Sequence, residues 1–88
     1  MPAHTASFNK IGDIKYYAYA IQDSITVSTG DTITCEDFVD EASSIKKAVL
    51  MQNSDGSEVD CTTLNNVVTV GGAVTSVECT LFVFGRRV

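Results

Sequence analysis

The chain has 88 residues, of which 44% are hydrophobic, six are basic and eleven are acidic, giving a net charge of -5. The hydrophobic content excludes an intrinsically disordered chain, and the acidic balance disfavours binding to nucleic acid. One histidine, three cysteines and no tryptophan leave too few side chains for most metal sites and catalytic triads. A chain this short buries a limited share of its surface as a monomer, so oligomerisation is the expected source of further stability.

The N-terminal residues do not combine a basic start with an apolar core, so no secretory signal is expected. The longest apolar runs, Ala48 to Met51 and Leu81 to Phe84, are far shorter than the roughly 20 residues that cross a bilayer. We therefore expect a soluble protein without a membrane partner. Residues 1–88 are expected to form a single β domain in which residues 1–8 are a mobile segment.

The first two strand patterns occupy the N-terminal third of the chain. Asp13 to Gln22, DIKYYAYAIQ, is rich in tyrosine and isoleucine and predicts a strand with apolar side chains on both faces. Such a strand is expected to be covered on both sides, within the domain or at a subunit contact. Ile25 to Cys35 contains two runs of threonine, isoleucine and valine around Thr29-Gly30-Asp31, which predicts a turn between two extended segments.

Residues 36–46 have two competing interpretations. Apolar residues from Phe38 to Val49 recur at spacings of four, three and four, and acidic residues precede the Lys46-Lys47 pair, as in a short helix. The alternative is a loop that carries Phe38 into the core as a hydrophobic plug. The sequence does not separate the two.

The next pattern is a hairpin. Ile45 to Gln52 and Glu58 to Leu64 are separated by a segment that contains Asp55-Gly56, a dipeptide typical of tight hairpin turns. The second of these strands alternates, so that one face is expected inside and the other in solvent. Turns are then expected at Asn65-Asn66 and at Gly71-Gly72.

The last predicted strand runs from Ala73 to Gly85. Its odd positions are the better core face, whereas its even positions end in Phe82 and Phe84, which need cover from a loop, a second sheet or a partner. About six strands result. They predict an all-β fold, a small antiparallel β-sandwich or jelly-roll-like domain. A short helix near residues 36–46 remains one of the two interpretations of that segment.

The residues offer little material for catalysis. His4 is the only histidine, and a Ser–His or Cys–His pair would need the N-terminal segment to fold into a cleft. Cys35, Cys61 and Cys79 show no C-x-x-C spacing, so buried, reduced thiols are expected and not a zinc site or a disulfide framework. We expect no enzymatic activity and no cofactor. Carboxylates clustered over residues 31–41 fit either a calcium site or a solvated acidic loop.

The order of turns and strands carries a resemblance. The features that carry it are Gly12-Asp13 before a strand, Gly30-Asp31-Thr32-Ile33, the Ile45 to Met51 strand, Asp55-Gly56, Asn65-Asn66-Val67 and the terminal TLFVFGRR. This layout resembles the small β-sandwich virion proteins of tailed bacteriophages, a group that includes head decoration or cement proteins and small tail-associated subunits. The resemblance implies a non-enzymatic structural protein that is made in the bacterial cytoplasm and present in many copies in the virion.

The expected function is therefore to oligomerise and to bind another virion protein, a major capsid or tail protein. The candidate partner interface consists of Tyr17, Tyr19, Phe82, Phe84, Arg86 and Arg87. Burial of such aromatic side chains between subunits removes apolar surface from water, and arginines next to an aromatic edge suit an acidic partner surface. The alternative is a carbohydrate- or calcium-binding β-sandwich module on a larger assembly.

Overall fold

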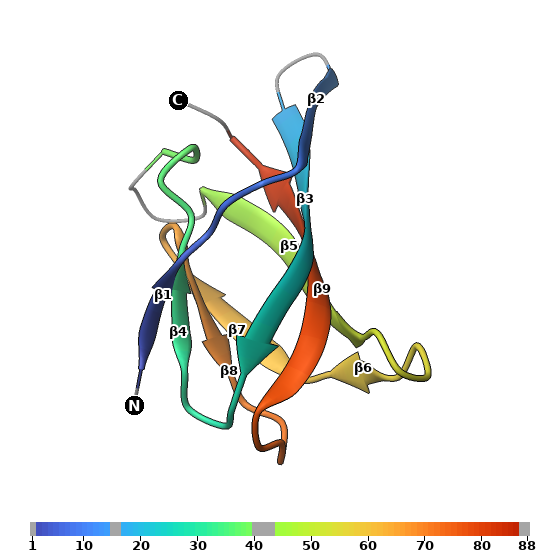
Figure 1. Cartoon of the computed structure of the whole chain (residues 1–88). Coiled ribbons are helices and arrows are strands. Elements are labelled where there is room, and N and C mark those ends of the chain that lie inside the picture. Colours follow the sequence, from blue (N-terminus) through green and yellow to red (C-terminus); the bar gives the residue numbers. More distant parts are fainter. Residues whose placement is uncertain (1, 15–16, 40–43, 87–88) are drawn as a thin grey trace.

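The computed structural model describes residues 2–14, 17–39 and 44–86, and these residues form strands and no helix. The nine strands are β1 (Ala3–Thr5), β2 (Lys10–Ile14), β3 (Tyr17–Val27), β4 (Thr32–Thr34), β5 (Ile45–Gln52), β6 (Glu58–Val59), β7 (Cys61–Leu64), β8 (Val67–Val70) and β9 (Val77–Gly85). One sheet has the order β1-β4-β8-β7 and the other the order β2-β3-β9-β5-β6. The sheets pack together (Figure 1). The expected sandwich-like all-β class is confirmed, with nine strands where the sequence predicted about six.

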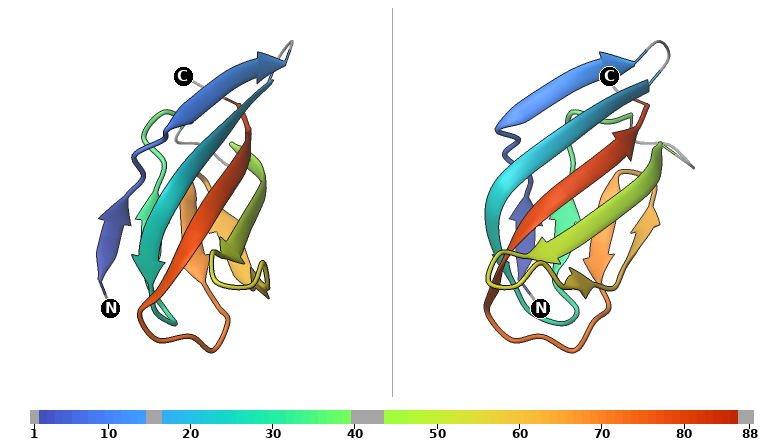
Figure 2. Two further views of the ribbon diagram at one scale, coloured as in Figure 1. Left: turned by 45° about the vertical axis from the view of Figure 1, so that its right-hand side comes forward. Right: turned by 90° about the vertical axis from the view of Figure 1, so that its right-hand side faces the viewer.

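The five-stranded sheet is the more regular of the two layers. The right-hand view of Figure 2 looks onto β2, β3, β9 and β5, which run side by side, with the four-stranded sheet behind them. We call the face of the five-stranded sheet that turns away from the other sheet its outer face. The inner face and the facing residues of the four-stranded sheet form the core, which includes Val27, Ile33, Leu50, Val68 and Leu81.

Residues 3–5 contribute an edge strand to the four-stranded sheet, and the expected mobility of residues 1–8 stays a prediction. β1 pairs in parallel with β4, with Thr5 opposite Thr34, and the Ala6 N–H donates to the Thr34 carbonyl at 2.9 Å. The chain then places Phe8 edge-on against Phe38, with ring centroids 6.0 Å apart. A parallel pair at an edge thus joins the otherwise antiparallel sandwich.

The single strand predicted from Asp13 to Gln22 is wrong, because this segment contributes to two strands. β2 and β3 form an antiparallel hairpin in which Gly12 lies opposite Tyr19. No glycine, proline or asparagine marks the turn, and residues 15–16, which connect the strands, lie outside the described residues. The turn between β3 and β4 is confirmed, with Gly30 at a φ of 88°.

A bulge in β3 keeps the core face apolar along the whole strand. Between Gln22 and Ile25 the register against β9 shifts by one residue, since Gln22 faces Leu81 and Ile25 faces Cys79. Even-numbered residues such as Ala20 point inward before the bulge, and odd-numbered residues from Ile25 onward point inward after it. An extra residue of this kind inverts the alternation of a strand, which here matches the sequence to the core.

The short helix near residues 36–46 is not present among the described residues, and residues 40–43 lie outside them. Phe38 is 1% exposed, so the alternative interpretation, a loop that plugs the core with Phe38, is confirmed. The Phe38 N–H donates to the Cys35 carbonyl and the Val39 N–H to the Arg86 carbonyl. The first bond closes a turn within the loop, and the second joins the loop to the residue that follows β9. The strand β5 begins at Ile45.

The hairpin around Asp55-Gly56 is confirmed, but its second strand is divided. β6 pairs with β5 through Leu50–Val59 and Met51–Glu58. After Asp60 the chain enters the other sheet as β7, and the Asp60 carbonyl accepts hydrogen bonds from the backbone of Gly71 and Gly72 at 2.8 and 3.0 Å. The predicted single strand to Leu64 therefore connects the two layers.

We expect Gly85→Ala to lower the free energy of unfolding by about 1–3 kcal/mol, the usual cost of overpacking. A Cβ at Gly85 would overlap the Ser44 carbonyl oxygen, a backbone atom that cannot rotate away. Gly71→Ala is the matched control, because its Cβ would meet only the Asp60 carbonyl at an ordinary 3.7 Å. Urea unfolding followed by circular dichroism measures both. Equal stability of the two variants would contradict the predicted clash.

Candidate functional site

The outer face of the five-stranded sheet is the candidate site, and its centre is apolar. Two cross-strand rows run over β3, β9 and β5. The first row contains Tyr19, Phe84 and Lys47, and the second contains Ile21, Phe82 and Val49. All the apolar members are half-buried by one another and not covered by the second sheet. They line a shallow hollow of about 140 Å³.

Aromatic contacts hold this face together. The Tyr17 and Phe84 rings are tilted against each other, with centroids 5.5 Å apart. The Tyr19 ring lies over Gly12 on the neighbouring strand, where any Cβ would collide with it. Cross-strand aromatic pairs contribute to sheet stability, and a ring can cover the backbone that a glycine leaves open. The side chains are therefore presented in a fixed arrangement.

The structure brings together four of the six residues predicted as the interface. Tyr17, Tyr19, Phe82 and Phe84 share the outer face. Arg86 follows Phe84 by two positions, is exposed, and comes directly after the last residue of β9. Arg87 lies outside the described residues.

The sequence prediction omitted the contribution of β5. Lys47, Val49 and Met51 alternate along that strand and lie beside the β9 aromatics on the outer face. Their period of two was visible in the sequence. What the sequence did not contain was the pairing partner of β5, and hence the fact that Val49 lies next to Phe82. The sequence of β5 has apolar residues on both strand faces, and this was the signal that its outward-facing side chains also need cover.

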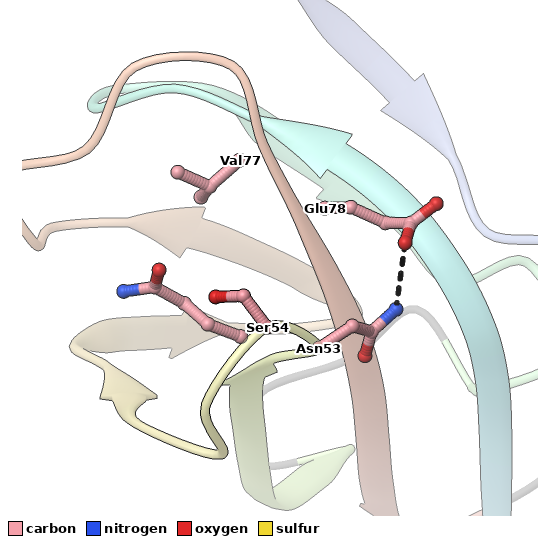
Figure 3. A pocket seen from close by; sticks show the side chains of 5 residues that line it. Asn53, Ser54, Val77 and Glu78 are labelled. Atoms are coloured by element: carbon pink, nitrogen blue, oxygen red, sulfur yellow. Dashed lines mark hydrogen bonds between the residues drawn. The ribbon is translucent and has the colours of Figure 1, made fainter.

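A second, polar hollow of about 370 Å³ lies where β9 begins, between Gln52, Asn53, Ser54, Val77 and Glu78 (Figure 3). Glu78 accepts hydrogen bonds from the Ser24 hydroxyl at 2.7 Å and from the Asn53 amide at 3.3 Å. These two bonds lower the pKa of Glu78. The carboxylate and the amide at this hollow are thus already engaged in holding β9 to its neighbours.

The acidic cluster of residues 31–41 is not a single group in the structure. Asp31 is buried, Glu36 and Asp37 are exposed, and residues 40–41 lie outside the described part of the chain. Among the described residues, no three His, Cys, Asp or Glu side chains come together in a way that would hold a metal ion. That part of the chain also contains no helix able to span a membrane.

His4 pairs with a carboxylate and not with a nucleophile. Its Nε2 lies 2.9 Å from Oδ2 of Asp31, which also accepts the Ser28 N–H at 3.0 Å. The other carboxylate oxygen, Oδ1, is buried without a hydrogen bond. The bond to His4 first and the Ser28 N–H second lower the pKa of Asp31 from its ordinary value of 3.8. This pair ties β1 to the turn between β3 and β4.

The cysteines are held in their protonated form. Burial, with a smaller effect of the nearby Asp37 carboxylate, raises the pKa of Cys35 to about 12. Burial likewise raises the pKa of Cys61 and of Cys79, and neighbouring Glu58 and Glu78 add to the effect. Since the thiolate is the reactive form, these residues are poor nucleophiles at neutral pH.

We expect Asp31→Asn to be less stable than the natural chain at neutral pH and to lose less stability in acid. A carboxylate with a lowered pKa in the folded state stabilises the fold above its unfolded pKa, near 3.8, and this contribution disappears as the pH falls through the folded-state value. Urea midpoints from pH 7 down to pH 2 test this. Asp37→Asn, at an exposed carboxylate, makes the same change in charge. Parallel pH profiles for the two variants would contradict the role assigned to Asp31.

We expect a thiol reagent to modify Cys61 first in the folded protein, because Cys61 is half-buried whereas Cys35 and Cys79 are fully buried. Mass spectrometry of the labelled protein over time measures the order, and unfolding in guanidinium should make all three react at similar rates. Native labelling of Cys35 as fast as that of Cys61 would rule out the protection described here.

Comparisons with known proteins add no relative. The chain matches no protein-family model, no curated protein and no solved structure. The fold and the outer face of the five-stranded sheet are therefore the features that bear on function.

Proposed function

We propose that this chain is a non-enzymatic structural protein of a tailed-bacteriophage virion, which oligomerises and binds a major capsid or tail protein. The observation that carries the proposal is the apolar outer face, where Tyr17, Tyr19, Phe82 and Phe84 lie together without cover from the second sheet. A contiguous apolar surface of this kind is characteristic of protein interaction sites. In this proposal the protein assembles in the bacterial cytoplasm and remains in the virion.

The mechanism is binding through many copies. Each Å² of apolar surface that leaves water contributes about 25 cal/mol, and a small face contributes modestly in one copy. When many copies are arranged on a regular shell or tube, their weak contacts act together, because each bound neighbour raises the effective concentration of the next. A subunit of this size suits such a role, since its stability also increases on assembly.

The chemistry of the described residues supports binding over catalysis. The ring of His4 is engaged with Asp31, and the cysteine thiols have raised pKa values. Neither residue type is placed next to the apolar hollow, which is lined by tyrosine, phenylalanine, aliphatic side chains and one lysine. Aromatic and aliphatic groups of this kind are suited to contact with another protein surface.

A ligand-binding module is the second candidate, and the polar hollow beside Asn53 and Glu78 is the observation in its favour. We rank it below the structural role for two reasons. The Glu78 carboxylate and the Asn53 amide are hydrogen-bonded to each other and to β3. Among the described residues, no aromatic ring lines the hollow, so none offers a surface on which a sugar would stack.

The proposal predicts that the chain is a component of purified particles. Virions of the phage whose genome encodes the chain should be banded on a density gradient, and their proteins quantified by mass spectrometry. We expect the chain in the particle band in many copies, at a constant ratio to the major capsid or tail protein. Non-structural proteins encoded by the same genome provide the contamination control. Recovery of the chain only from the soluble lysate would contradict a virion role.

A further inference from the structure

The charges around the outer face are arranged in an ordered way along the strands. A third cross-strand row follows the two described above and contains Thr80, Met51 and Glu58. The first row therefore ends in a basic residue, Lys47, and the third row ends in an acidic one, Glu58. The middle row, with Ile21, Phe82 and Val49, is apolar across β3, β9 and β5.

The residues beyond the first and third rows along β9 have the same charges as the ends of those rows. Arg86 lies beyond the first row, two positions after Phe84, and Glu78 lies beyond the third row, two positions before Thr80. Both are exposed, as are Lys47 and Glu58. The outer face thus has a basic end, an apolar centre and an acidic end. Lys10 flanks the middle row at the β2 edge, where its side chain is open to solvent.

We infer that the outer face binds a second copy of this chain face to face, about a two-fold axis that runs along the middle row and perpendicular to the strands. This inference deepens the proposed function, on whose oligomerisation it rests. A two-fold contact requires a surface that is complementary to itself. Rotation about this axis lays the first row of one copy on the third row of the other, and the apolar middle row on itself.

The charges at the two ends of the face favour this orientation, although the axis also brings Lys10 at the β2 edge near Lys10 of the partner subunit. With the axis along the middle row, Lys47 lies across from the region of Met51 and Glu58 of the partner subunit. Arg86 lies across from the region of Glu78 of the partner subunit, a carboxylate that also accepts hydrogen bonds from Ser24 and Asn53 within its own copy. Each pairing occurs twice by symmetry. A two-fold axis parallel to the strands would instead place the two basic ends together and the two acidic ends together. Like charges that face each other across an interface repel, so this second orientation is unfavourable.

The contact area is small, so we expect weak self-association of the isolated protein. The three rows cover only a part of one small sheet. A dimer that forms at high concentration in solution would be stabilised in an assembly, where other contacts hold the copies near each other. Sedimentation equilibrium from about 10 µM to about 1 mM measures the dissociation constant of a weak dimer.

The first test exchanges the charges. We expect Lys47→Glu and Glu58→Lys each to raise the dimer dissociation constant about tenfold or more, because each single change places like charges across the interface. The double variant, which carries both changes, should restore the dissociation constant to within about threefold of the natural chain. Glu36→Lys, at an exposed position outside the face, is the matched control and should have no effect.

The second test concerns the apolar centre. Val49→Lys introduces a charge beside the axis in both copies and should abolish the dimer, with circular dichroism used to verify the fold. The charge-exchange variants alter exposed side chains only, so they test the inference even if Val49→Lys does not fold. A natural chain that stays monomeric at about 1 mM, a double variant without rescue, or a folded Val49→Lys dimer would each overturn the inference. Particle composition is measured independently, so presence in the virion would stand if the chain were monomeric.

Discussion

The position of β9 between β3 and β5 is the constraint on which the rest of the structure depends. Alternation along this central strand turns Leu81 and Val83 into the core and Phe82 and Phe84 to the outer face. Because β9 is paired on both edges, its register against two neighbours decides which side chains accompany each phenylalanine. The core and the candidate surface are therefore two sides of the same strand.

Two register shifts adapt the neighbours to β9. The shift between Gln22 and Ile25 inverts the alternation of β3, and another between Ile45 and Lys47 does the same at the start of β5. Without these shifts, parts of each strand would turn polar residues toward the core. The shifts also gather the apolar outward-facing residues into the central rows. The same register shifts therefore decide both which side chains fill the core and which side chains form the candidate surface.

Features that depend on a local sequence signal were predicted correctly from the sequence, whereas strand pairings without such a signal were missed. The turns at Gly30 and Gly56 were predictable, since a positive φ favours glycine at both positions. The hairpin between β2 and β3 was missed because its turn has no such residue. Pairing of β1 with β4 was missed as well, because three residues at an edge carry no periodic pattern.

The sequence by itself determined that this is an all-β chain with more apolar strand faces than one small core can cover, and that Phe82 and Phe84 lie on the face opposite the core residues of their strand. The tertiary structure alone decided that Tyr19 and Val49 flank these phenylalanines, and that basic and acidic residues occupy opposite ends of the face. The physical reason is that alternation is a local property of a strand. Strand neighbours and register depend instead on long-range packing and on bulges, which no local pattern specifies.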